Sequence, residues 1–228
     1  MDFFYSIVRS FTAGGVFMLP ILFTGALAAA ITIERYVTLA KMGAGNRRTW
    51  SGVEPAIASG DFDKARELTS KDDSPIARVL SMGLALQGAV RRRDDIEKAM
   101  QESMMEIVPR LEKRTHYLAT LANVATLLGL LGTVSGLIHA FAAVATVNPA
   151  EKANLLSASI SEAMNCTAFG LITAVPILVL HAFLQSKTMG LSDGLETAAI
   201  RFLNAVAARE AARAHSRMEL VRQAASAA

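Results

Sequence analysis

Three stretches of the 228-residue chain contain no charged side chain, and they set the architecture that the sequence predicts. They cover residues 10–33, 115–150 and 163–186. A helix that crosses the hydrocarbon core of a membrane needs about 20 predominantly apolar residues, and each stretch is long enough. A helix on the surface of a soluble protein would instead carry polar side chains along its wet face. The pattern predicts an all-α integral membrane protein with transmembrane helices over residues 16–33, 119–147 and 160–186.

The distribution of positive charge predicts how these helices are oriented. Of the 23 Lys and Arg residues, 21 fall within the segments 34–118 and 187–228. Loops on the cytoplasmic side of a membrane carry the excess of Lys and Arg. We therefore expect the N-terminus outside and long helices extending into the cytoplasm. The net charge of +3 is explained by this topology and not by nucleic-acid binding.

The segments outside the spans predict further helices. We expect an N-terminal interfacial segment over 1–15, a cytoplasmic helical region over 34–118, a short periplasmic loop over 148–159, and a C-terminal helix and tail over 187–228. A cleavable signal peptide is the alternative for residues 1–30, because Arg9 precedes an apolar run that ends in small residues. We favour a span, since the apolar run is long and the charged residues 34–35 follow it.

Helix signals within the cytoplasmic region predict its internal boundaries. The glycines and asparagine at positions 43, 45 and 46 predict a helix break, and Gly60-Asp61 predicts a turn. The run over residues 72–75 predicts a helix start with proline near its first position. Another helix is expected to start around 94–95 and to continue into the second span, with at most a bend at Pro109.

Small and polar residues in the second span are the first candidates for a function. Gly129, Gly132 and Gly136 follow helical spacing, and small residues let helices approach closely in lipid. Packing within the chain explains this pattern as well as a contact with another subunit does. Asn123, Thr126 and Thr133 share a face, and a polar stripe in a span faces protein or water rather than lipid.

Glu162 is the acidic residue of the third span that lies at membrane depth away from the cytoplasmic end. A charge there costs a few kcal/mol, about 3 on insertion scales, so a functional role is the default hypothesis. The alternative is an interfacial carboxylate that caps the start of its helix. Thr167 continues the polar character inward, although its hydroxyl has the option of bonding to its own helix. No nucleotide-binding loop, metal-ligand spacing or nucleophile–base pair is evident, so we expect neither an enzyme nor a cofactor.

Several motifs resemble those of the MotA/TolQ/ExbB proton channel family. In the second span the motif is LLGLLGTVSGLI over residues 127–138, followed by Ala140 and Phe141. In the third span the motifs are SEA over 161–163, TAFGLI over 167–172 and AVP over 174–176. ER at 34–35 and GDF at 60–62 also fit. Three spans with an outside N-terminus resemble the ExbB/TolQ branch.

The resemblance implies a subunit of a proton-driven motor in the bacterial inner membrane. It implies a homo-oligomer, a pentamer, around the single spans of a partner similar to ExbD or TolR whose aspartate carries the proton. By position, Thr133 and Thr167 would line the proton path with Asn123 and Thr126, and Glu162 would lie near subunit contacts. Thr126 stands where the family commonly has proline.

Two other functions are compatible with three spans. A non-conducting membrane scaffold would use the glycine faces for assembly, but it has little need of a polar stripe. A secondary transporter is disfavoured, since inverted repeats and broken helices are missing. Whether the ion is a proton or sodium, and which process is powered, does not follow from the residues.

Overall fold

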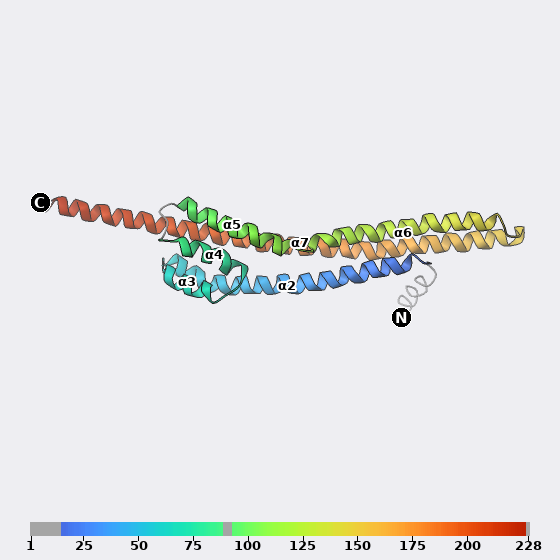
Figure 1. Ribbon diagram of the computed structural model, residues 1–228, viewed down its shortest axis with the longest axis horizontal. Helices are drawn as coiled ribbons and strands as arrows, with labels where there is room; N and C mark the ends of the chain where they lie inside the picture. The colour runs from blue at the N-terminus through green and yellow to red at the C-terminus, as the bar shows by residue number, and fades with distance from the viewer. Residues whose placement is uncertain (1–14, 89–92, 227–228) are drawn as a thin grey trace. The chain divides into compact units, whose positions relative to one another are not determined.

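The computed structural model describes residues 15–88 and 93–226, and its elements are all α-helices (Figure 1). They are α2 (Met18–Ala58), α3 (Phe62–Ser70), α4 (Pro75–Leu86), α5 (Arg93–Glu112), α6 (Thr115–Val144) and α7 (Pro149–Ser226). Three stretches are long and apolar enough to cross a membrane: one in α2, one between Arg93 and Val144, and one in α7. The predicted all-α fold with three spans is confirmed.

The chain divides into two compact units, which we describe separately. The span unit contains residues 15–36 and 114–186, and the core unit contains residues 37–113 and 187–226 of the described chain. α6 belongs to the span unit, and α3, α4 and α5 belong to the core unit. The long helices α2 and α7 contribute residues to both.

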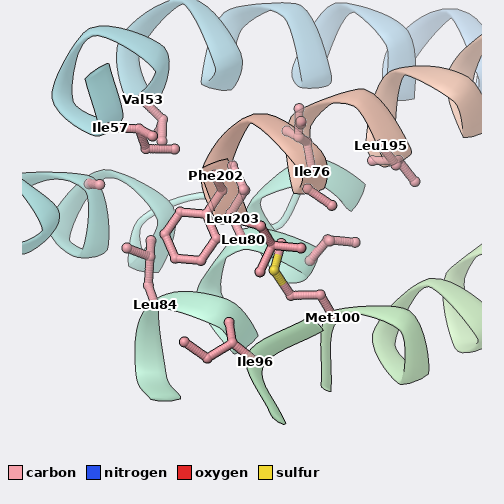
Figure 2. Close-up of a cluster of buried hydrophobic side chains, with 14 of the residues drawn as sticks. Val53, Ile57, Ile76, Leu80, Leu84, Ile96, Met100, Leu195, Phe202 and Leu203 are labelled. Atoms are coloured by element: carbon pink, nitrogen blue, oxygen red, sulfur yellow. The ribbon is translucent and has the colours of Figure 1, made fainter. Parts of the chain in front are cut away.

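Large apolar side chains from all five of its helices form the centre of the core unit (Figure 2). Phe202 of α7 is fully buried and meets Phe62 of α3 edge-to-face, with 5.9 Å between ring centroids. Leu80 of α4 and Met100 of α5 are buried around it. Complete burial of one such side chain contributes about 1.5–3 kcal/mol, so this cluster is the main source of the unit's stability.

Two helix boundaries follow the sequence signals. The side chain of Ser74 caps α4 by accepting a hydrogen bond from the Ala77 amide, and Pro75 occupies the first helical position. Gly60 adopts a positive φ of 72° between α2 and α3, and the Asp61 carboxylate accepts from the Lys64 amide. The predicted helix start at residues 72–75 and the predicted turn at Gly60-Asp61 are therefore confirmed.

The predicted break at residues 43, 45 and 46 is wrong, because α2 continues through it. The two glycines leave room for neighbours: a Cβ at Gly43 would lie 3.3 Å from Leu191, and one at Gly45 would lie 3.5 Å from Ser74. The side-chain carbonyl of Asn46 accepts a hydrogen bond of 3.1 Å from the Ile76 amide. The two glycines thus allow close packing, and Asn46 caps the start of α4. These tertiary contacts override the low helix propensity of glycine and asparagine.

The prediction that the helix from residues 94–95 continues into the second span is also wrong. α5 does start at Arg93 and passes through Pro109, but it ends at Glu112. Arg114 then adopts a φ of 67°, which no residue in a right-handed helix has, and α6 starts at Thr115. The helix is therefore interrupted at Arg114, after the end of α5, and not at Pro109.

The link between the second and third spans is shorter than predicted. Only residues 145–148 lie between α6 and α7, and residues 150–158 form the first turns of α7. Proline at the first helical position and Glu151 in the first turn both favour a helix start at Pro149. The interfacial segment predicted over residues 1–15 falls, except for Gly15, outside the described residues.

Candidate proton path between α6 and α7

The glycines of α6 pack against small residues of α7 in antiparallel register. A Cβ added at Gly129 would lie 3.2 Å from the Cα of Gly170. Farther along α6, Gly132 faces Cys166, and a Cβ at Gly136 would lie 2.9 Å from the Cβ of Ala163. Helices that approach this closely gain dispersion energy along their backbones, which is how helices associate in lipid.

The closest approach is between Gly129 and Gly170, and it is a contact between backbones. A Cβ on Gly170 would lie 2.8 Å from the Ala125 carbonyl oxygen and 3.0 Å from the Cα of Gly129. Backbone atoms cannot rotate away as a flexible side chain can. Any residue larger than glycine at position 170 would therefore push the two helices apart.

Thr167 makes a hydrogen bond across this contact. Its hydroxyl donates to the carbonyl oxygen of Gly129 over 2.8 Å. The alternative in which Thr167 bonds to its own helix is therefore wrong, because the glycine contact brings a carbonyl of α6 within its reach. The bond ties a polar group of the third span to the backbone of the second.

The Gly129 carbonyl also connects Thr167 to Thr133. In a regular helix the amide of a residue donates to the carbonyl four residues earlier, and Thr133 is four residues after Gly129 within α6. The Gly129 carbonyl oxygen thus accepts hydrogen bonds from both the Thr133 amide and the Thr167 hydroxyl. The two threonines that the sequence singled out share one backbone acceptor.

The other predicted polar residues, Asn123, Thr126 and Thr133, lie on α6. Thr133 donates its hydroxyl to the Leu130 carbonyl over 2.6 Å, and Thr126 donates to the Ala122 carbonyl over 3.1 Å. Thr126 and Asn123 are exposed on the chain's own surface, and Thr133 is half-buried. Bonding back to the helix satisfies each hydroxyl proton in an apolar medium.

Glu162 lies next to the start of α2 instead of at the start of its own helix. It follows Pro149 by 13 residues, so it cannot cap α7, and the capping role in that alternative is wrong. Its carboxylate contacts Gly15, which has a φ of 73° and precedes the first turn of α2. The N-terminal end of a helix carries partial positive charge and favours a carboxylate beside it.

Charged residues close the other end of the span unit. Arg114 donates from one guanidinium nitrogen to both carboxylate oxygens of Glu34, each over 2.7 Å. Arg35 beside them is only 4% exposed, and burial lowers the pKa of its guanidinium while Glu34 acts in the opposite direction. No group of three or more His, Cys, Asp or Glu side chains that could hold a metal occurs in the described part of the chain.

The structure brings together some of the predicted site residues and leaves others apart. Thr167 meets Gly129 directly, and all three glycines meet α7 of the same chain, whereas Asn123 and Thr126 are exposed on the chain's own surface. The residues on the α7 side of the contact, Ala163, Cys166 and Gly170, were not predicted from the sequence. Their spacing of three and four residues, the same as that of the α6 glycines, is the signal that could have identified them.

Comparison with known proteins decides the family. Residues 71–197, more than half of the chain, match the MotA/TolQ/ExbB proton channel family. The chain belongs to this family. The matched range contains Thr133, Glu162 and Thr167 together with the whole of α6.

Individual members of the MotA/TolQ/ExbB family are similar over different shares of the chain. The putative biopolymer transport protein ExbB-like 3 of Synechocystis is 29% identical over 168 residues, which cover 73% of this chain and 79% of that protein. The biopolymer transport protein ExbB of Neisseria gonorrhoeae is 26% identical over 211 residues, covering 83% and 91%. The Tol-Pal system protein TolQ of Haemophilus influenzae is 37% identical over 84 residues, covering 37% and 36%. The chain is thus an ExbB/TolQ-like, multi-pass membrane protein.

Proposed function

We propose that this chain is the channel-forming subunit of a proton-driven motor in the bacterial inner membrane. It would couple proton-motive force to mechanical work through a partner subunit. The observation that supports this most directly is the hydrogen bond from the Thr167 hydroxyl to the Gly129 carbonyl, a polar group at the glycine contact in a member of a proton channel family. A scaffold would need the glycines but not the hydroxyls.

The proton carrier would come from another chain. The predicted spans contain no aspartate, and their one acidic side chain is that of Glu162, which lies beside Gly15. We propose that five copies of this chain surround the single spans of an ExbD/TolR-like partner, and that the partner's aspartate takes and releases the proton. Burial in the pore would raise the pKa of that aspartate and allow it to hold a proton.

The hydroxyls would respond to the charge on the partner's aspartate. In the structure the protons of Thr133 and Thr167 are both engaged with carbonyl oxygens, while the oxygen lone pairs can still accept a hydrogen bond. A protonated carboxyl can donate to them as they stand. An ionised carboxylate can only accept, so a hydroxyl would have to leave its carbonyl to reach it. Each proton transfer would therefore change which positions along the pore suit the partner span, and relative rotation would follow.

The remaining predicted residues have supporting parts in this proposal. Asn123 and Thr126 would extend the polar lining along α6. Glu162 of α7, which lies beside the start of α2, would be near a subunit contact. Gly129, Gly132 and Gly136 would hold α6 and α7 together in the wall of the pore. The lipid bilayer would surround the assembly. We propose that the transported ion is the proton and not sodium, because the predicted spans lack a cluster of carboxylates.

Removal of single hydroxyls tests this proposal. In the complex with its partner, Thr167→Val and Thr133→Val keep the side-chain shape and remove the hydroxyl, and we expect proton flux to fall at least about tenfold, the effect of one lost positioned interaction of about 1.4 kcal/mol. Thr167→Ser keeps the hydroxyl and should retain flux. Thr32→Val removes a hydroxyl that only bonds to the Ala28 carbonyl within α2, and it serves as the matched control. Unchanged flux in Thr167→Val and Thr133→Val would remove both residues from the path.

A further inference from the structure

The break between α5 and α6 lacks the residues that usually produce one. Helices that end in a left-handed residue use glycine, or sometimes asparagine, at that position. Here the left-handed residue is Arg114, with a φ of 67°, and it follows Lys113. Lys and Arg are good helix formers, and a side chain beyond glycine is strained at this φ. The local sequence therefore favours continuation of the helix.

The hydroxyl of Thr115 provides a second sign that the helix is interrupted. It is buried and has no hydrogen-bond partner among the residues that the structure describes. Thr24, Thr32 and Thr126 each donate to the carbonyl four residues earlier, over 2.8, 2.8 and 3.1 Å. For Thr115 that carbonyl belongs to Leu111, on the far side of the break. A helix continued through residues 111–115 would give Thr115 the bond that the other three threonines have.

The contact that opposes this continuation is the ion pair between Arg114 and Glu34. Both carboxylate oxygens of Glu34 accept from the same guanidinium nitrogen over 2.7 Å, so the arginine is fixed to α2. Continuing the helix would turn Arg114 to a φ near −60° and change the direction of its side chain. The Tyr117 amide, which would pair with Lys113 in a continuous helix, instead donates to the Arg114 carbonyl over 3.2 Å.

We propose that the Glu34–Arg114 pair is a latch that holds the α5–α6 junction open against the helical preference of its own residues. When the latch is released, α5 and α6 join into one continuous helix. The junction is also the point at which the chain passes from the core unit to the span unit. Release of the latch changes the stiffness of that connection, independently of whether the chain conducts protons.

Hydrogen exchange at the amides of residues 113–117 tests the latch in the full-length protein in lipid nanodiscs. Arg114→Ala and Arg114→Gly both remove the ion pair, but alanine favours the continuous helix and glycine favours the left-handed turn. We expect exchange in Arg114→Ala to be slower than in the unsubstituted protein and at least about tenfold slower than in Arg114→Gly, because the two preferences act in opposite directions. Glu34→Gln should also slow exchange relative to the unsubstituted protein, although it weakens an ion pair.

The controls distinguish a latch from an ordinary stabilising contact. Arg110→Ala breaks the pair with Glu106 inside α5 and should leave exchange at residues 113–117 unchanged. Faster exchange in Arg114→Ala, Arg114→Gly and Glu34→Gln alike would show that the pair merely stabilises the junction, and would overturn the proposal. If Arg114→Ala does not accumulate as folded protein, Glu34→Gln decides alone: slower exchange supports the latch and faster exchange contradicts it.

Discussion

Two phenylalanines show how differently the two units of this protein are built. Phe202 is fully buried at the centre of the core unit, whereas Phe141 of the span unit is 66% exposed on the chain's own surface. The buried positions of α6 are instead held mainly by alanine and glycine, such as Ala122, Ala125 and Gly129. Large side chains form the centre of the core unit, whereas many of those in the span unit lie on its surface, although Met18, Ile21, Leu118 and Leu184 are buried there.

The difference follows from the two solvents. In water, a large apolar side chain gains about 1.5–3 kcal/mol from burial, so such side chains collect in the interior. In lipid that gain disappears, because the hydrocarbon chains are as apolar as the protein interior. Helices there associate through close backbone contact and hydrogen bonds, as at Gly129, Gly170 and Thr167. Since α2 and α7 run through both units, each of these helices follows both sets of rules along its length.

Truncation of the two phenylalanines should produce the largest contrast. Phe202→Ala would leave a cavity in the core unit and is expected to cost about 4 kcal/mol of unfolding free energy. Phe141→Ala should cost under about 0.5 kcal/mol, the usual range for an exposed site. Thermal unfolding of the purified protein in detergent measures both. Equal losses would contradict the assignment of residue 141 to an uncovered face.

Glycine substitutions should give the next largest effect on the unfolding free energy, and here the larger loss is expected in the span unit. Gly170→Ala forces a Cβ against the backbone of α6, and we expect a loss of about 3 kcal/mol. Gly83→Ala in the core unit meets the sulfur of Met100 at 2.6 Å and the ring of Phe202 at 2.7 Å, which can shift, so about 1.5 kcal/mol is expected.

A third glycine provides the control. Gly190 of α7 has open space where a Cβ would lie, and Gly190→Ala should stabilise the helix by up to about 1 kcal/mol. The same unfolding measurement gives all three values. A Gly170→Ala variant as stable as Gly190→Ala would show that α6 and α7 do not approach through their backbones.

Surface charges of the core unit should matter much less. Arg201 pairs with Glu54 and lies over the Trp50 ring at 5.9 Å, with its side chain 57% exposed. Arg201→Ala is expected to cost about 0.5 kcal/mol, because exposed ion pairs are screened by water and salt. Raising the salt concentration should reduce this cost further. A loss comparable to that of Phe202→Ala would mean that charge, and not apolar burial, stabilises the unit.

The smallest expected effect is the pH dependence at Asp72. The Thr49 hydroxyl donates to this carboxylate and holds the pKa of Asp72 below its usual value, although burial acts against it. The unfolded chain then binds the proton more readily, so the stabilisation is complete above about pH 4 and is lost as the pH falls further. Thr49→Val should lower the melting temperature more at pH 6 than at pH 3. An equal decrease at both pH values would exclude this linkage.

The sequence predicted the elements whose signals are local. Charge-free stretches identified the spans, and the serine and proline at positions 74–75 identified the start of α4, since both depend only on neighbouring residues. The glycines at 43 and 45 predicted a break wrongly, because their reason lies in contacts with Leu191 and Ser74, far along the chain. The break at Arg114 carries no local signal at all.

The candidate site shows the same division. Spacing alone placed the three glycines of α6 on one face, and the structure shows what that face contacts. The hydrogen bond from Thr167 to Gly129 could not be predicted, because it depends on the register between two helices that are 38 residues apart at this point. The place of Glu162 beside Gly15 depends in the same way on how α2 packs.

Proton flux into liposomes tests the central claim most directly. The chain alone is compared with the chain assembled with its single-span, aspartate-bearing partner. The proposal predicts no flux from the chain alone and clear flux from the complex, because the partner supplies the proton carrier. Absence of flux from a correctly assembled complex would contradict it and favour a non-conducting membrane scaffold.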